Sequence, residues 1–108
     1  MNDNDLLWVE YEKDKSPIVQ KKLLLAYVNL VHYVIHRSKF VLNGILDERD
    51  YFQYGVEGLN EAIKRYRING EQRFETFAIQ RIRGKIIDEL KKLQNKKHNN
   101  QQPSPKTN

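Results

Sequence analysis

The sequence predicts an all-α protein, a compact domain of about four helices, and three observations carry this prediction. Apolar residues recur at spacings of three and four in several long segments, which is the periodicity of one face of an α-helix. The alternation of apolar and polar residues that marks a β-strand does not occur, and neither does an internal repeat. The 108 residues, 39% of them hydrophobic, are enough for one domain with a small core.

Composition excludes several classes of protein. With zero cysteines there is no disulfide framework and no thiolate metal site. No apolar run approaches the roughly 18 residues of a membrane span, and the acidic start is no signal peptide, so we expect a cytoplasmic protein with no membrane partner. His32 and His36 have metal-ligand spacing but no evident third ligand, so no metal or cofactor is expected. No nucleophile–base pair is placed for catalysis, and the protein is not expected to be an enzyme.

The first two helices are marked by a strong boundary. Residues 1–16 form an acidic N-terminal segment, with a helix predicted over Asp5–Lys15. We expect Trp8 in this helix to pack against the next helix. The alternative is that the first helix is a mobile flap or the docking site of a partner. Ser16 followed by Pro17 is a helix start, with serine as the N-cap and proline at the first helical position. We expect the second helix to run from Pro17 to about Lys39. Its buried face is predicted at Ile18, Leu24, Val28, Val31 and Ile35.

A third helix follows a loop predicted over residues 40–46. Asp47 is its expected N-cap, and it is predicted to run to about Tyr66. Gly55 and Gly58 lie within it, and each costs about 1 kcal/mol relative to alanine in a helix. They indicate that another backbone approaches closely, either a neighbouring helix or a docked partner. Its apolar face is predicted at Phe52, Val56, Leu59, Ile63 and Tyr66.

The fourth helix, predicted over Arg73–Leu93, is the segment around which the chain is organised. Between residues 73 and 97 there are eight Lys/Arg and three Asp/Glu, so this part carries the whole net charge of +5. Such polarity favours an anionic partner, with a merely solvated helix face as the alternative. The polar residues 95–108 are predicted to be a disordered tail. The buried stripe is expected at Phe74, Ala78, Ile82, Ile86, Leu90 and Leu93.

Aromatic and polar side chains are interleaved with these cations. Cations that hold phosphates beside an aromatic ring that can stack a base are what single-stranded nucleic acid requires of a protein. We therefore predict that this helix binds nucleic acid. The candidate residues are Arg73, Thr76, Phe77, Gln80, Arg81, Arg83 and Lys85.

Two linked sequence blocks resemble region 2 of the sigma-70 family of transcription initiation factors. Residues 50–59, DYFQYGVEGL, are similar to the family pattern DLIQEGxIGL. Residues 73–84, RFETFAIQRIRG, are similar to the pattern KFxTYAxxxIR and follow at the family's separation without a gap. The ending RIRGKIIDELKKL most resembles the flagellar and sporulation class. The resemblance covers about residues 17–93, so we predict a region 2-like domain over 17–94.

The resemblance implies two surfaces. One docks on the clamp of the largest subunit of core RNA polymerase, and the other opens and reads the single-stranded promoter −10 element. There a flipped nontemplate base is held against an aromatic, and Phe77 takes the place of the usual tyrosine. Gln80 and Arg81 replace the two tryptophans of housekeeping members, so weaker autonomous melting is expected. The implied polymerase-binding residues are Asp50, Gln53, Tyr54, Gly55 and Glu57.

No helix-turn-helix for a −35 element follows the second block. The initiating methionine and the tail favour a stand-alone region 2 that works with a separate −35-reading polypeptide, and a fragment of a full-length sigma factor is the alternative. Two further alternatives stay open. The chain could be an adaptor or decoy that binds polymerase or a regulator without reading promoters, or a general RNA- or DNA-binding protein that needs no polymerase. The cationic face distinguishes the first reading from a decoy, which does not need it. A general nucleic-acid binder is expected to bind without polymerase.

Overall fold

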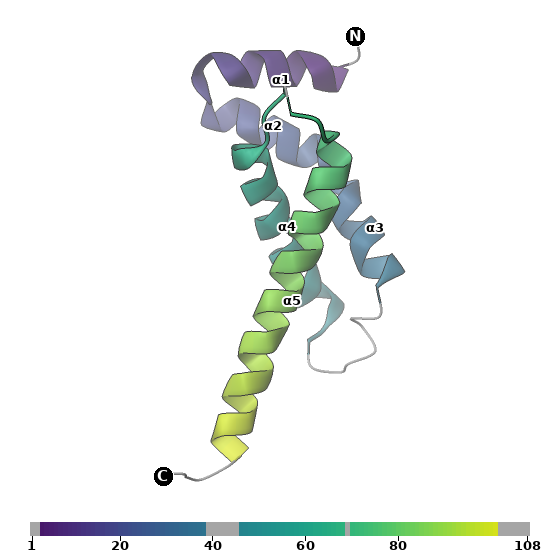
Figure 1. Ribbon diagram of the computed structural model, residues 1–108, viewed down its shortest axis with the longest axis vertical. Helices are drawn as coiled ribbons and strands as arrows, with labels where there is room; N and C mark the ends of the chain where they lie inside the picture. The colour runs from purple at the N-terminus through teal and green to yellow at the C-terminus, as the bar shows by residue number, and fades with distance from the viewer. Residues whose placement is uncertain (1–2, 39–45, 69, 102–108) are drawn as a thin grey trace.

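The computed structural model describes residues 3–38, 46–68 and 70–101, and these ranges form five helices. Helix α5 is the longest and runs down the length of the molecule, while the other four gather around its N-terminal half (Figure 1). The predicted all-α class is confirmed. The helices are α1 (Asp3–Asp14), α2 (Pro17–Tyr27), α3 (Asn29–Arg37), α4 (Glu48–Arg65) and α5 (Phe74–Gln101).

The predicted start signals are confirmed at α2 and α4. The Ser16 hydroxyl oxygen accepts hydrogen bonds from the backbone N–H groups of Ile18 at 3.2 Å and Val19 at 3.5 Å. The Asp47 carboxylate accepts one from the Asp50 N–H at 2.9 Å. Each cap satisfies a donor that the first turn of a helix leaves without an intrahelical partner.

The single helix predicted over Pro17–Lys39 is wrong, because the chain bends by 41° between α2 and α3. At the bend the Val31 N–H bonds to the Val28 carbonyl, three residues back, at 2.9 Å. No proline or glycine marks this break in the sequence; the bend lets α2 pack on α1 and α4 while α3 packs on α4 and α5. The described chain therefore has five helices where about four were predicted. No single described helix is long and apolar enough to cross a membrane, and α2 and α3 reach that limit only as a bent pair.

The buried face of α2 also differs from the prediction. Ile18 is 70% exposed and Leu25 63% exposed, whereas Val19 and Leu23 are buried. In α4 the predicted Leu59 and Ile63 are buried, but Tyr51 is buried as well, while the predicted Phe52 and Val56 are only half-buried. Apolar residues are adjacent to one another at both places, so periodicity alone does not separate the buried one from the exposed one.

The α4–α5 pair is the most extensive helix contact, and at Gly58 of α4 the backbone of α5 approaches closely. A Cβ atom at Gly58 would lie 2.9 Å from the Arg81 carbonyl oxygen and 2.9 Å from the Ile82 Cα. A Cβ atom at Gly55 would lie 2.5 Å from Val31 of α3. The close approach that these glycines predicted is therefore made by helices of this chain.

The predicted stripe of α5 is confirmed from Phe74 to Leu90, all of whose members are buried, and Leu93 is half-buried. The helix continues to Gln101, which corrects the predicted end near Leu93 and the irregular tail from residue 95. No glycine or proline interrupts residues 94–101, so nothing local stops the helix there. Residues 102–108 of the predicted tail and 40–45 of the predicted loop lie outside the described residues.

An aromatic cluster joins α1 to the start of α5. The Trp8 ring centroid lies 4.9 Å from that of Phe74 and 5.3 Å from that of Tyr66. The Trp8 indole N–H also donates to the Tyr27 hydroxyl of α2 at 3.0 Å. This contact confirms the prediction that Trp8 packs against the second helix.

Replacing Gly58 by alanine should lower the free energy of unfolding by about 1–3 kcal/mol, because the added methyl group meets backbone atoms that cannot yield. Gly84→Ala is the matched control, since a Cβ atom there has no neighbour within 4 Å. That change should raise the free energy of unfolding by about 0.5–1 kcal/mol through helix propensity. Urea unfolding followed by circular dichroism measures both. Equal effects of the two substitutions would contradict the packing role of Gly58.

Candidate nucleic-acid interface

One face of α5 is exposed and carries three of the predicted nucleic-acid residues. Thr76, Gln80 and Arg83 follow one another at spacings of four and three, and all three side chains are exposed. Arg73 directly precedes the helix, with 83% of its side chain exposed and its guanidinium 4.0 Å from Glu75. The Arg83 guanidinium donates to the Ser38 hydroxyl at 3.3 Å. This face thus offers two guanidinium groups and two neutral polar groups along one side of the helix.

Phe77 is half-buried at the edge of this face and leans on Tyr66, with 5.8 Å between their ring centroids. Both side chains line a hollow of about 340 Å³ at the α4–α5 connection. The Tyr66 hydroxyl donates to the Gln72 carbonyl oxygen at 2.8 Å, which fixes the connection beside the hollow. We call this cavity of about 340 Å³ the Phe77 hollow. Its lining residues are Arg65, Tyr66, Arg67, Gly70, Glu71, Gln72 and Phe77.

The lining of the Phe77 hollow combines two aromatic rings with two guanidinium groups. An aromatic wall accepts the flat face of any base, and guanidinium groups hold phosphates or stack on the base themselves. The sequence analysis identified Phe77 but missed Arg65, Tyr66 and Arg67. The available signal was the segment Arg65-Tyr66-Arg67, an aromatic residue between two cations at the end of a predicted helix.

Arg81 and Lys85 point to a different part of the molecule from the other candidates. The Arg81 guanidinium donates to the Glu61 carboxylate at 2.8 Å. The Lys85 ammonium lies 3.4 Å from Glu89 and 3.7 Å from the carboxylates of both Glu57 and Glu61. These two cations therefore tie α5 to α4, and their charges are already matched by carboxylates. We refer to these five residues as the α4–α5 ion network.

The α4–α5 ion network shifts the pKa values of its members. The hydrogen bond from Arg81 lowers the pKa of Glu61 from its usual 4.5, against an opposing effect of burial, and the charge of Lys85 lowers it further. Burial lowers the pKa of Lys85, but the hydrogen bond to Glu89 and the nearby carboxylates outweigh it and raise that pKa above 10.5. At neutral pH both groups are therefore charged.

The residues predicted to bind polymerase are mostly on the outer side of α4. Gln53 and Glu57 are exposed, and Asp50 and Tyr54 are half-buried. Gly55 is buried against α3, so its position serves packing within this chain. Because Glu57 is paired with Lys85 of the α4–α5 ion network, the two predicted surfaces adjoin each other.

Of the two histidines, His32 packs against an aromatic side chain. The His32 ring stacks on Phe52 with 4.9 Å between centroids and 26° between the planes. Within the described ranges no three His, Cys, Asp or Glu side chains are grouped so that they could hold a metal ion.

The fold and this surface define a class, an all-helical domain that displays cations and aromatic rings around its longest helix. The sequence profile of the family described as Sigma-70 region 2 matches residues 23–96, and the chain belongs to this family. It is similar to the RNA polymerase sigma-D factor of Bacillus subtilis, with 31% identity over 90 residues, which are 83% of this chain and 35% of that protein. It is similar to the RNA polymerase sigma factor FliA of Escherichia coli, with 35% identity over 88 residues, 82% of this chain and 35% of that protein.

A third relative, the RNA polymerase sigma factor FliA of Yersinia enterocolitica, is 38% identical over 79 residues, 72% of this chain and 32% of that protein. These relatives confirm the predicted family and its flagellar class. The chain spans about a third of the length of the curated relatives that it matches. Sigma factors are transcription initiation factors and not enzymes, in agreement with the expectation from the sequence.

Lowering the pH should destabilise the domain through Glu61. Its pKa is lower in the folded than in the unfolded chain, so the stability that it contributes is present above about pH 4.5 and is lost as the pH falls through the lowered folded value. Glu61→Gln should therefore reduce the dependence of the urea midpoint on pH between neutral pH and about pH 3. Arg81→Gln should reduce it similarly, and the double variant no further. Additive effects of the two substitutions would contradict the pairing of Arg81 with Glu61.

Proposed function

We propose that this chain is a transcription initiation factor domain that binds core RNA polymerase through α4 and captures the melted −10 nontemplate strand through α5. The observation that carries the proposal is the Phe77 hollow, where Tyr66 and Phe77 stand beside Arg65 and Arg67. Membership of the sigma-70 region 2 family and relatives named as RNA polymerase sigma factors support it. Work with bacterial RNA polymerase takes place in the cytoplasm.

The base-capture step uses the exposed face of Phe77. A flipped base stacks on this ring while Arg65, Arg67 or Arg73 holds a neighbouring phosphate. Thr76 and Gln80, one on each side of Phe77 along the helix, offer hydrogen bonds to a base edge or to the backbone of the strand. A hollow of about 340 Å³ is large enough for one base without enclosing a longer strand.

The polymerase-docking step uses the outer face of α4. Gln53 and Glu57 project from it, with Asp50 and Tyr54 at its edge. In this proposal the clamp of the largest subunit contacts these four side chains. Gly55 contributes by allowing α3 to pack closely behind them.

The α4–α5 ion network has a positioning role in this scheme. Arg81 and Lys85 were predicted to hold phosphates, but their contacts with Glu57, Glu61 and Glu89 favour a role in fixing α5 against α4. Docking through α4 would then place the Phe77 hollow at a defined distance from the polymerase. Arg73, with 83% of its side chain exposed, is the remaining predicted cation that we propose to hold a phosphate.

Recognition of the −35 element is assigned to a different unit. We propose that it comes from a separate polypeptide or from another segment of a longer sigma factor, because α1 to α5 provide the region 2 fold. A polymerase- or regulator-binding decoy is the competing function. The cationic face of α5 and the lining of the Phe77 hollow favour the initiation role, since a decoy has no use for either.

Phe77→Ala should reduce promoter opening by the chain together with core polymerase by roughly 5- to 150-fold, because it removes a stacking interaction of about 1–3 kcal/mol. Phe77→Leu is the matched control for packing, since it keeps an apolar side chain against Tyr66 but lacks the ring. Phe77→Tyr should keep opening at the rate of the unsubstituted chain, because it keeps the ring. Fluorescence of a base analogue in the −10 region measures promoter opening by each variant. Opening by the leucine variant at the rate of the unsubstituted chain would show that base stacking is not the role of Phe77.

Gln53→Arg should weaken binding to core polymerase at least tenfold, because a longer cationic side chain occupies the centre of the proposed docking face without disturbing the core. Lys22→Gln, a change of an exposed residue on α2, is the control and should leave binding unchanged. Surface plasmon resonance with immobilised core polymerase measures both affinities. Unchanged binding of the Gln53 variant would remove this face of α4 from the docking surface.

A further inference from the structure

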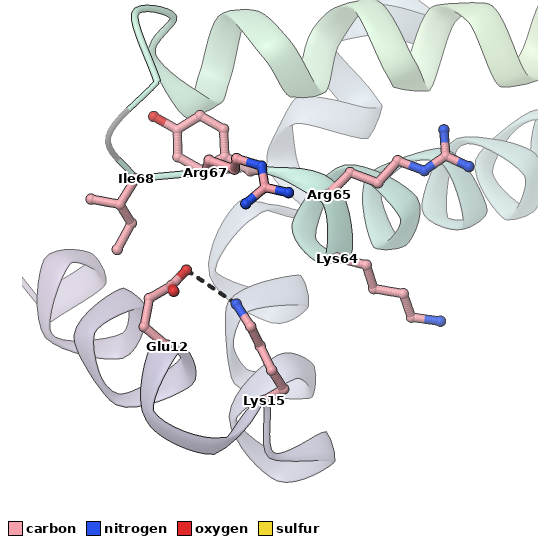
Figure 2. Close-up of a pocket in the computed structure, with 7 residues that line it drawn as sticks. Glu12, Lys15, Lys64, Arg65, Arg67 and Ile68 are labelled. Carbon is pink, nitrogen blue, oxygen red and sulfur yellow. Dashed lines mark hydrogen bonds and ion pairs between the residues drawn. The ribbon is translucent and has the colours of Figure 1, made fainter.

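A second and larger hollow lies between the end of α1 and the end of α4 (Figure 2). Its volume is about 790 Å³, which is within the usual range for small-molecule sites. We call it the α1–α4 hollow. The segments that line it are some fifty residues apart in sequence, and they are Glu12, Lys15, Lys64, Arg65, Tyr66, Arg67 and Ile68.

The lining of the α1–α4 hollow is strongly cationic. Four of its seven residues are Lys or Arg and one is an acid, so its formal charge is +3. Lys15 pairs with Glu12 at 3.1 Å, whereas Lys64, Arg65 and Arg67 form no ion pair within the described part of the chain. Figure 2 shows Lys15 and Arg67 on opposite sides of the opening, with Lys64 and Arg65 extending outward along α4. Glu12 is thus the one carboxylate among the cations of this lining, and it pairs with Lys15.

The backbone conformation of Lys15 fixes where this side chain leaves the end of α1. Lys15 has a φ of 54° and is the only non-glycine residue with positive φ in the described ranges. This left-handed conformation ends α1, where its N–H bonds to the Tyr11 carbonyl at 2.8 Å, and glycine is the residue that adopts it without cost. The Lys15 ammonium is held 4.7 Å from the Tyr11 ring centroid and beside Glu12, at the wall of the hollow. Residues that stay in a disfavoured conformation are concentrated at ligand sites.

We propose that the α1–α4 hollow binds a small polyphosphate ligand of the nucleoside di- or triphosphate class. Lys15 and Arg67 hold the terminal phosphate, and Lys64 or Arg65 neutralises the next one. Tyr66 and the exposed Ile68 provide an aromatic and an apolar wall for the remainder of the ligand. The formal charge of +3 complements the three or four negative charges of such a phosphate chain.

Ligand binding at the α1–α4 hollow regulates strand capture at the Phe77 hollow, and this part of the inference rests on the proposed function. Arg65, Tyr66 and Arg67 line both the α1–α4 hollow and the Phe77 hollow. A polyphosphate that engages these guanidinium groups removes them from the phosphates of a captured strand. Ligand binding and strand capture therefore oppose each other, and by linkage each lowers the affinity for the other by the same factor.

The site itself is tested on the free, full-length chain, without DNA or polymerase. Isothermal titration with inorganic triphosphate should show saturable binding at one site, while orthophosphate at matched ionic strength should bind far more weakly. Arg67→Gln should weaken triphosphate binding about tenfold, because a charge-assisted hydrogen bond is lost. Lys22→Gln, a cation removed from the exposed surface of α2, is the matched control and should bind as the unsubstituted chain does.

Lys15→Gly distinguishes a ligand-binding role of this lysine from a structural one. It should weaken triphosphate binding about tenfold and at the same time raise the thermal unfolding midpoint, because glycine relieves the left-handed backbone. A merely structural lysine would not lose ligand affinity while the fold becomes more stable. Absence of saturable triphosphate binding, or an equal loss in the Lys22 variant, would overturn the proposal.

Competition separates this site from the proposed function. Triphosphate should displace a labelled single-stranded −10 oligonucleotide from the chain bound to core polymerase, and Arg67→Gln should reduce that displacement. Triphosphate binding without any capture of the oligonucleotide would leave the site intact and contradict the proposed function. Oligonucleotide binding that Lys15→Gly weakens, without binding of triphosphate, would show that the hollow follows the strand's own backbone and would overturn the small-ligand assignment.

Discussion

The close approach of α4 and α5 at Gly58 is the constraint on which the rest of the structure depends. Because no side chain intervenes at Gly58, the Arg81 carbonyl oxygen and the Ile82 Cα come within van der Waals reach of α4. The same approach brings Lys85 within ion-pair distance of Glu57 and Glu61. Packing thus decides which cations of α5 are matched by carboxylates, and it also decides which sides of the two helices face outward.

This arrangement redistributes the positive charge that the sequence assigns to the C-terminal helix. Arg81 and Lys85 are matched by acids of α4 and α5, so they contribute little to the field outside the molecule. Two of the cations without such pairs, Arg65 and Arg67, lie at the α4–α5 connection beside Tyr66. The turn before α5 therefore carries positive charge next to the half-buried rings of Tyr66 and Phe77.

The sequence predicted the features that depend on local chemistry and missed those that depend on tertiary packing. The caps at Ser16 and Asp47 and the buried stripe of α5 follow from residue type and spacing, and all were found. The bend at Val28 has no proline or glycine to mark it, because contacts of α2 and α3 with different helices produce it. The ion pairs of Arg81 and Lys85 depend on how α5 is rotated against α4, which one helix viewed alone does not reveal.

Helix α1 lies outside residues 23–96, the part that the family profile matches, yet it contributes to both ends of the candidate surface. Trp8 packs on Tyr66 and Phe74, so α1 supports the ring that faces the Phe77 hollow. Glu12 and Lys15 form one wall of the α1–α4 hollow. A change in the position of α1 would therefore move an aromatic support and a cation together. Tyr66 borders both hollows, so α1 adjoins the Phe77 hollow through Trp8 and the α1–α4 hollow through Glu12 and Lys15.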